Sequence, residues 1–172
     1  YFVVISAEEF EGIDPARFKA VVDEFFAPLV DDIRIVAYVR PHAGRITSSF
    51  AERLKIGTRR VLDLTLTEFA EKQRQRGAFL YTPRFQAWRA LFGDRFTLRP
   101  MVRSQLHNGD VLDDFLKVAF AGIPATVQAG PVANESLSIE DLLRIKVVQD
   151  KVKGPNQLRL RVGWELARLL GS

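Results

Sequence analysis

The stretch from Asp32 to Gly57 constrains the fold of this chain most strongly. It begins with the apolar run Ile33 to Val39, turns at Arg40 and Pro41, and continues with helical spacing of apolar residues up to Gly57. The β-branched run indicates a buried strand, and the glycine indicates a helix end. Arg40 and Ser48 lie eight positions apart, at the end of the strand and in the first turns of the helix. An open α/β sheet presents such side chains to a bound phosphate.

The positive charge of the chain is concentrated in the same region. The formal net charge of the whole chain is only +4, which is too small to indicate general binding of nucleic acid. Between residues 40 and 60, one acid, Glu52, stands against six basic residues, namely Arg40, Arg45, Arg53, Lys55, Arg59 and Arg60. We therefore expect a local anion site and no nucleic-acid partner.

The order of elements predicts an α/β fold. A length of 172 residues predicts one domain. Strands are expected at Tyr1–Ile5, Ile33–Val39 and Arg95–Arg103. Because of Pro100, the last of these is either an edge strand or a strand that ends early. Helix caps and glycine stops predict helices over about 15–29, 42–56, 66–76, 83–92, 111–121 and 139–151, with a loop at 122–133. A last helix is expected to carry Leu158, Val162, Leu166 and Leu169. The expected arrangement is a core of residues 1–130 with a helical tail of residues 131–172.

Composition excludes several kinds of site. The chain has no cysteine and two histidines, so a thiolate or histidine-built metal site is not expected. No apolar run approaches the roughly 20 residues of a membrane-spanning helix, and we find no secretory signal pattern. We expect a cytoplasmic protein without a membrane span or a bound metal. The sequence also contains no GxxxxGK[ST], GxGxxG or GxSxG motif.

Several segments together resemble a group of bacterial sulfotransferase-like proteins. The strand that ends in YxR, followed by a helix with serine eight residues after the arginine, is similar to the 3′-phosphate-binding segment of sulfotransferases that use 3′-phosphoadenosine-5′-phosphosulfate (PAPS). The likeness covers roughly residues 1–123 and includes ISAEEF (Ile5–Phe10), YVRP (Tyr38–Pro41), SSFAERLKIG (Ser48–Gly57), WRALFGDRFTLRP (Trp88–Pro100) and GDVLDDFL (Gly109–Leu116).

The resemblance implies a fold and an activity. The fold would be a three-layer arrangement around a mostly parallel sheet, of the P-loop-containing sulfotransferase type. The activity would be transfer of a sulfuryl group from PAPS to a hydroxyl or amine acceptor, such as a carbohydrate or small metabolite. Arg40 and Ser48 would bind the 3′-phosphate of the nucleotide, and Arg45 is a third candidate contact. The family's phosphosulfate-binding loop would precede Tyr1 and is not in this sequence, so we expect an upstream strand and loop to be missing.

Sulfuryl transfer to a hydroxyl needs a general base. Glu8 is the first candidate because it follows the first expected strand, and the adjacent Glu9 is the second. Alternatively, Glu8 and Glu9 are solvated acids without a catalytic role. At the phosphate site, the alternative is that Arg40 is a solvated residue and Ser48 a half-buried helix residue, without a ligand. Two other functions stay open, namely a non-catalytic nucleotide-binding or interaction domain of this fold and a P-loop kinase acting on a small molecule.

Overall fold

The structure of the chain is a computed structural model that describes residues 2–121, 123 and 137–170. These residues are mostly helical and include one small sheet of two parallel strands. Strand β1 (Ile35–Val39) pairs with strand β2 (Phe96–Pro100), with Ile35 opposite Phe96 and Val39 opposite Pro100. The described residues thus form an α/β arrangement dominated by helices. The early end of the second strand at Pro100, one of the two expected alternatives, is confirmed.

The helices follow the predicted order, except that the sequence did not predict the short helix α3. The α-helices are α1 (Pro15–Val21), α2 (His42–Lys55), α3 (Arg59–Leu62), α4 (Leu66–Gln75), α5 (Tyr81–Phe92), α6 (Val111–Phe120), α7 (Ile139–Lys151) and α8 (Asn156–Leu170). A π-helical turn, Val22–Phe26, extends α1, and short 3₁₀ turns occupy Glu8–Gly12, Gly93–Arg95, Arg103–Gln105 and His107–Gly109.

Side-chain caps explain where several helices begin. The Asp14 carboxylate accepts a hydrogen bond from the Ala16 amide (3.3 Å), and the Asp110 carboxylate accepts from the amides of Leu112 and Asp113 (2.7 and 3.1 Å). Thr65 and Glu68 form a capping box at the start of α4. Helix α5 is an exception, because it begins at Tyr81 and its N-cap, Leu80, makes no side-chain cap bond.

Contacts group the chain into two compact units. The first unit comprises Tyr1–Val39 and Leu80–Pro124, and the second comprises Arg40–Phe79 and Ala125–Ser172. The boundary after Val39 lies between β1 and α2, so the two parts of the predicted phosphate site, Arg40 and Ser48, belong to the second unit. The expectation of a single domain stays a prediction.

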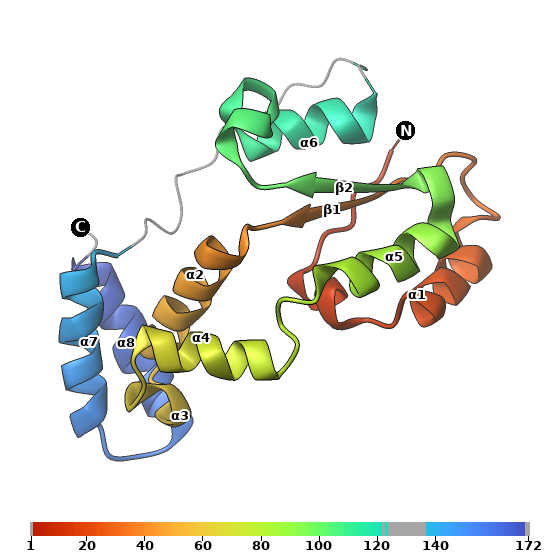
Figure 1. The fold of residues 1–172 in the computed structure, drawn as a ribbon. Helices are drawn as coiled ribbons and strands as arrows, with labels where there is room; N and C mark the ends of the chain where they lie inside the picture. Colours follow the sequence, from red (N-terminus) through yellow and green to blue (C-terminus); the bar gives the residue numbers. More distant parts are fainter. Residues whose placement is uncertain (1, 122, 124–136, 171–172) are drawn as a thin grey trace. The chain divides into compact units, whose positions relative to one another are not determined.

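The first unit is built around its parallel strand pair. In Figure 1, α1 and α5 lie on one side of β1 and β2, and α6 lies on the other side. The core on the α1–α5 side contains Val22, Trp88, Phe92 and Phe96, with Phe18 and Phe85 packed against it. The side chain of Trp88 is buried in this cluster.

The second unit buries the inner face of α2. Leu54 of α2 packs with Val61, Leu62 and Phe69, and the half-buried residues Ile46, Phe50 and Leu64 complete the cluster. Helices α7 and α8 also contact α2. Gly57, with a positive φ of 68°, ends the segment after α2 as the sequence predicts. This packing anchors the carboxyl-terminal end of α2 in the second unit, and the amino-terminal turns of α2 extend from that anchored end.

The prediction of a strand at Tyr1–Ile5 is wrong for the residues of this segment that the structure describes. Residues 2–7 form no regular secondary structure, and Phe2, Val3, Val4 and Ile5 are between 50% and 85% exposed. A strand requires a neighbouring strand for its backbone hydrogen bonds, and in the described residues β1 pairs with β2 instead. The crossover between the two strands therefore runs through α2–α5, not through α1. The loop expected at 122–133 falls, apart from residue 123, outside the described residues.

Candidate functional site

The candidate site lies where β1 passes into α2. Pro41 follows Arg40 and disfavours the helical conformation of the arginine, so helix α2 begins only after the proline, at His42. Pro41 itself is the N-cap of α2 (φ −51°, ψ 146°) and provides no side-chain cap for the helix amides. The first turn of this 14-residue helix contains no acidic residue. The positive end of the helix dipole is therefore not neutralised by a side chain of its own first turn.

Arg40 and Ser48 are in direct contact. The Nη1 atom of Arg40 donates a hydrogen bond to the Ser48 hydroxyl oxygen at 2.9 Å. Both side chains are exposed. The strand end and the second turn of α2 thus bring a guanidinium and a hydroxyl together, as the eight-residue spacing predicts. An oxyanion that reaches this point meets a planar set of N–H donors and an O–H donor.

Two further residues of α2 lie near the start of the helix. Arg45 is half-buried, and its amide donates a hydrogen bond to the Pro41 carbonyl at 2.9 Å. The His42 ring lies 5.2 Å from the ring of Phe79, at an interplanar angle of 40°. Arg45 thus lies one helical turn after the N-cap, and its role as a phosphate contact stays a prediction.

The predicted catalytic acids lie in the 3₁₀ turn Glu8–Gly12 of the first unit. Glu8 is exposed. The side chain of Glu9 falls outside the part of the chain that the structure describes. Their unit differs from that of Arg40 and Ser48. The roles of Glu8 and Glu9 as general base therefore stay predictions.

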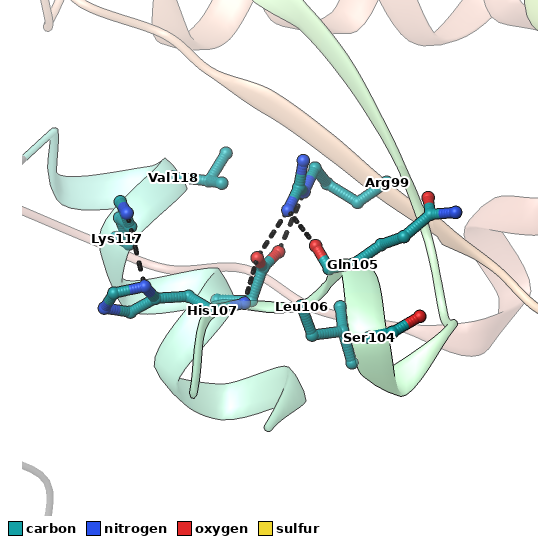
Figure 2. Close-up of a pocket in the computed structure, with 8 residues that line it drawn as sticks. Arg99, Ser104, Gln105, Leu106, His107, Lys117 and Val118 are labelled. Atoms are coloured by element: carbon teal, nitrogen blue, oxygen red, sulfur yellow. Dashed lines mark hydrogen bonds and ion pairs between the residues drawn. The ribbon is translucent and has the colours of Figure 1, made fainter. Parts of the chain in front are cut away.

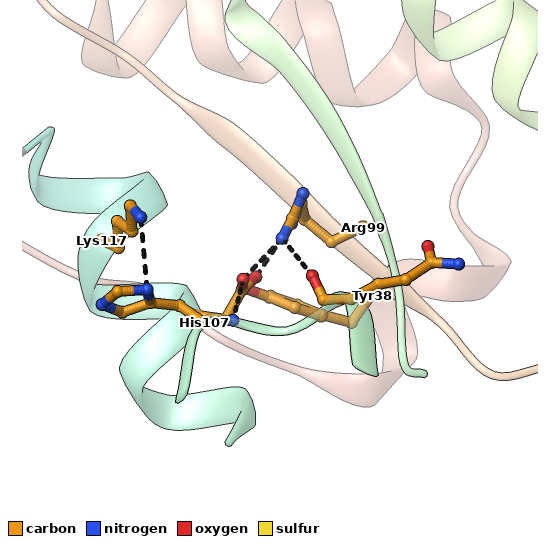
Figure 3. Close-up of polar contacts among 6 residues, drawn as sticks. Tyr38, Arg99, His107 and Lys117 are labelled. Carbon is orange, nitrogen blue, oxygen red and sulfur yellow. Dashed lines mark hydrogen bonds and ion pairs between the residues drawn. The ribbon is translucent and has the colours of Figure 1, made fainter. Parts of the chain in front are cut away.

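A second cluster of polar residues, which the sequence did not suggest, lies in the first unit around Asp114 (Figure 3). The Asp114 side chain is only 1% exposed. Its Oδ2 accepts hydrogen bonds from the Tyr38 hydroxyl (2.8 Å) and Arg99 Nε (2.9 Å). Its Oδ1 accepts from Arg99 Nη2 (2.6 Å) and from the backbone amide of His107 (2.9 Å). Strands β1 and β2, a 3₁₀ turn and α6 are thereby joined through one carboxylate.

This cluster changes the acid–base properties of its members. Hydrogen bonds from Arg99, from the His107 amide and from Tyr38 hold the pKa of Asp114 well below its usual range, although burial acts in the opposite direction. Burial raises the pKa of Tyr38 far above its usual range, and the hydrogen bond to Asp114 adds to the effect. The carboxylate is therefore ionised and the phenol is protonated throughout the physiological pH range.

Sequence reasoning missed this cluster because its members come from separated elements. Tyr38 and Asp114 are 76 positions apart, and Arg99 and Asp114 are 15 positions apart. Two sequence features pointed to buried polar residues here. The alternation of apolar and polar residues in β2 turns Arg99 away from the apolar core, and Asp114 lies within the apolar part of α6. Neither pattern identifies the partner.

The chain matches no known family model, and no curated protein or solved structure is significantly similar to it.

Two further observations concern the described residues alone. None of their helices combines the length and the apolar character that are needed to cross a bilayer. Within the same residues, no group of three or more histidine, aspartate or glutamate side chains is arranged to hold a metal ion.

Proposed function

We propose that the protein binds PAPS and transfers its sulfuryl group to a hydroxyl or amine acceptor, such as a carbohydrate or a small metabolite. The observation that supports this proposal best is the hydrogen bond between Arg40 and Ser48 at the start of α2. It brings together, on exposed side chains, the two groups that the resemblance to sulfotransferases assigns to the 3′-phosphate of the nucleotide.

The chemistry of this pair suits a phosphate dianion. Arg40 would donate to two phosphate oxygens, and the Ser48 hydroxyl would turn from accepting the Arg40 bond to donating to a third oxygen. The amino-terminal end of α2 adds a favourable dipole. Charge-assisted hydrogen bonds of this kind contribute about 1.5–3 kcal/mol each, which corresponds to about tenfold or more in affinity.

The fold is compatible with this proposal. The first unit places helices on both sides of a parallel strand pair, as Figure 1 shows. A larger sheet with helices on both faces is the three-layer arrangement that we propose for the complete sulfotransferase-type fold. In such folds ligands bind beyond the carboxyl ends of the strands, and Arg40 directly follows the carboxyl end of β1.

For the transfer step we propose in-line attack of the acceptor oxygen or nitrogen on sulfur. The new bond to sulfur forms as the bond between sulfur and the bridging phosphate oxygen breaks, and adenosine 3′,5′-bisphosphate leaves with the electron pair. Glu8, or Glu9 in its place, would take the proton of the acceptor. Arg40 and Ser48, with Arg45 as a third contact, would hold the nucleotide during this step.

Arg40→Ala is expected to weaken the binding of adenosine 3′,5′-bisphosphate by about tenfold or more, because it removes the charged donors to the 3′-phosphate. The melting temperature should be nearly unchanged, since the Arg40 side chain is exposed. Isothermal titration calorimetry at constant ionic strength measures the affinity of the variant and of the wild-type protein.

Arg59→Ala is the matched control for this experiment. It removes the same charge from an exposed position in the same basic segment, outside the proposed site. Affinity that falls equally in both variants would indicate general electrostatic attraction and would contradict the assignment, as would unchanged affinity in Arg40→Ala. Tighter binding of ATP than of adenosine 3′,5′-bisphosphate would favour a small-molecule kinase instead.

A further inference from the structure

A cavity of about 450 Å³ lies beside the Asp114 cluster in the first unit (Figure 2). It is open to solvent on one side and is lined by residues of the 3₁₀ turns Arg103–Gln105 and His107–Gly109, by Arg99 of β2 and by helix α6. Its lining consists of Arg99, Ser104, Gln105, Leu106, His107, Asp114, Lys117 and Val118. Sites for small molecules generally span about 300–1,000 Å³, so the cavity is large enough for a small organic ligand.

The carboxylate of Asp114, the acidic group in the cavity lining, already accepts as many hydrogen bonds as it readily can. Both oxygens of Asp114 accept two hydrogen bonds each, from Tyr38, Arg99 and the His107 amide. The ion pair with Arg99 also balances the carboxylate charge. Asp114 therefore has little capacity left to bind a cation or a donor group of a ligand.

The remaining polar groups are mostly hydrogen-bond donors. The Lys117 Nζ atom lies 3.2 Å from Nδ1 of His107. Because an ammonium group can only donate, Nδ1 is the acceptor in this contact, and the proton of a neutral His107 ring is then on Nε2. Arg99 bonds to Asp114 and to the Gln105 carbonyl through Nε and Nη2, and these bonds do not use Nη1. The Arg99 side chain retains 30% exposure.

We propose that this cavity binds a small organic molecule that carries an oxyanion, such as a phosphate or sulfate monoester. Lys117 supplies a positive charge that is not balanced within the cavity lining, and Arg99 and His107 supply further N–H donors. Leu106 and Val118 offer apolar contact to the body of the ligand. The inference does not depend on the proposed role of Arg40 and Ser48, because all lining residues belong to the first unit.

The two histidines make the proposal directly testable. His107 lines this cavity, and His42 lies at the start of α2 in the second unit, so their ring Cε1–H signals in NMR report on different sites. A His42→Gln variant assigns the two signals. The experiment titrates phenyl phosphate at constant pH, with sodium chloride at equal ionic strength as the reference. We expect a saturable shift of the His107 signal.

Lys117→Met should weaken this binding by about tenfold or more, because it removes the charged donor. Since Lys117 is exposed, the variant is expected to fold, which the dispersion of the same spectra checks. Lys151→Met, an exposed lysine of α7, is the matched control and should bind as the wild-type protein does.

Several outcomes would overturn the proposal. They are the absence of a saturable shift at His107, an unchanged affinity in Lys117→Met, and an equal response to uncharged phenol. A response of His42 alone would place the anion in the second unit and would equally refute the cavity as its site. Titration with adenosine 3′,5′-bisphosphate, followed at His42, tests the nucleotide proposal separately, so that one proposal can fail while the other holds.

Discussion

Replacing Gly163 by alanine is expected to lower the free energy of unfolding by about 3 kcal/mol or more, through a clash between helix backbones. A Cβ atom at Gly163 of α8 would lie 1.7 Å from the carbonyl oxygen of Lys55 at the end of α2, and 2.7 Å from the Lys55 carbonyl carbon. Both of these Lys55 atoms are backbone, so they cannot move aside by a rotamer change. The two helices would have to separate.

That separation would also break the polar contacts around Gly163. The buried Gln149 side chain donates through Nε2 to the carbonyl of Lys55 and to that of Arg159, both at 2.8 Å. Arg159 is 2% exposed, and its guanidinium donates to the carbonyls of Gln149 and Val152 near the end of α7. Loss of these bonds leaves buried polar groups without partners and adds to the cost of the clash.

Gly44→Ala is the matched control for this variant. Gly44 is also helical, and a Cβ atom there meets nothing within 4 Å. Because alanine favours the helix over glycine, this change should stabilise the protein by up to about 1 kcal/mol. Urea unfolding followed by circular dichroism gives both values. Equal stability of Gly163→Ala and the wild-type protein would contradict the described contact of α8 with α2.

Replacing Asp114 by asparagine is expected to lower the free energy of unfolding by about 3 kcal/mol at neutral pH. The change keeps the volume but leaves the Arg99 charge without its partner and introduces an amide N–H₂ that faces donors. We expect the lower end of the range for a broken buried ion pair, because the Arg99 side chain keeps 30% exposure. Asp113→Asn, on the same helix, removes a carboxylate charge at a side chain that accepts a hydrogen bond from Asn108 Nδ2, and it should have a small effect.

The effect of Asp114→Asn should depend on pH. Because the folded structure holds the pKa of Asp114 well below its usual range, through Arg99 first, this carboxylate stabilises the folded state above its unfolded pKa of about 4. The contribution is lost as the pH falls from there through the folded pKa. The stability difference between the wild-type protein and Asp114→Asn should therefore be largest near neutral pH and shrink toward pH 2. A difference that stays constant over this range would contradict the ion pair.

The elements that the sequence predicted correctly are those determined by local chemistry. Capping by Asp14, Asp110 and Ser138 involves residues within three positions of each other, so the pattern is visible in the chain itself. The contact between Arg40 and Ser48 was also predictable, because a strand end followed by two helical turns brings these positions together. The candidate phosphate site rests on this local geometry.

The features that the sequence did not predict depend on contacts between distant elements. The apolar run Phe2–Ile5 has the composition of a strand, but composition does not reveal whether a partner strand is present. The bonds of Asp114 to Tyr38 and Arg99, and the approach of Gly163 to Lys55, join residues that lie far apart in the sequence. The cavity beside Asp114 could be recognised only from the positions of the side chains in the structure, because the spacing of His107 and Lys117 in the sequence matches no known binding motif.

The most direct test of the proposed nucleotide site is a crystal structure of the protein with adenosine 3′,5′-bisphosphate. We expect the 3′-phosphate within hydrogen-bond distance of the Arg40 guanidinium and the Ser48 hydroxyl, at the start of α2. The direct bond between Arg40 and Ser48 (2.9 Å) should then be replaced by bonds to the phosphate. A bound nucleotide whose phosphates contact neither residue, with the Arg40–Ser48 bond intact, would contradict the proposal.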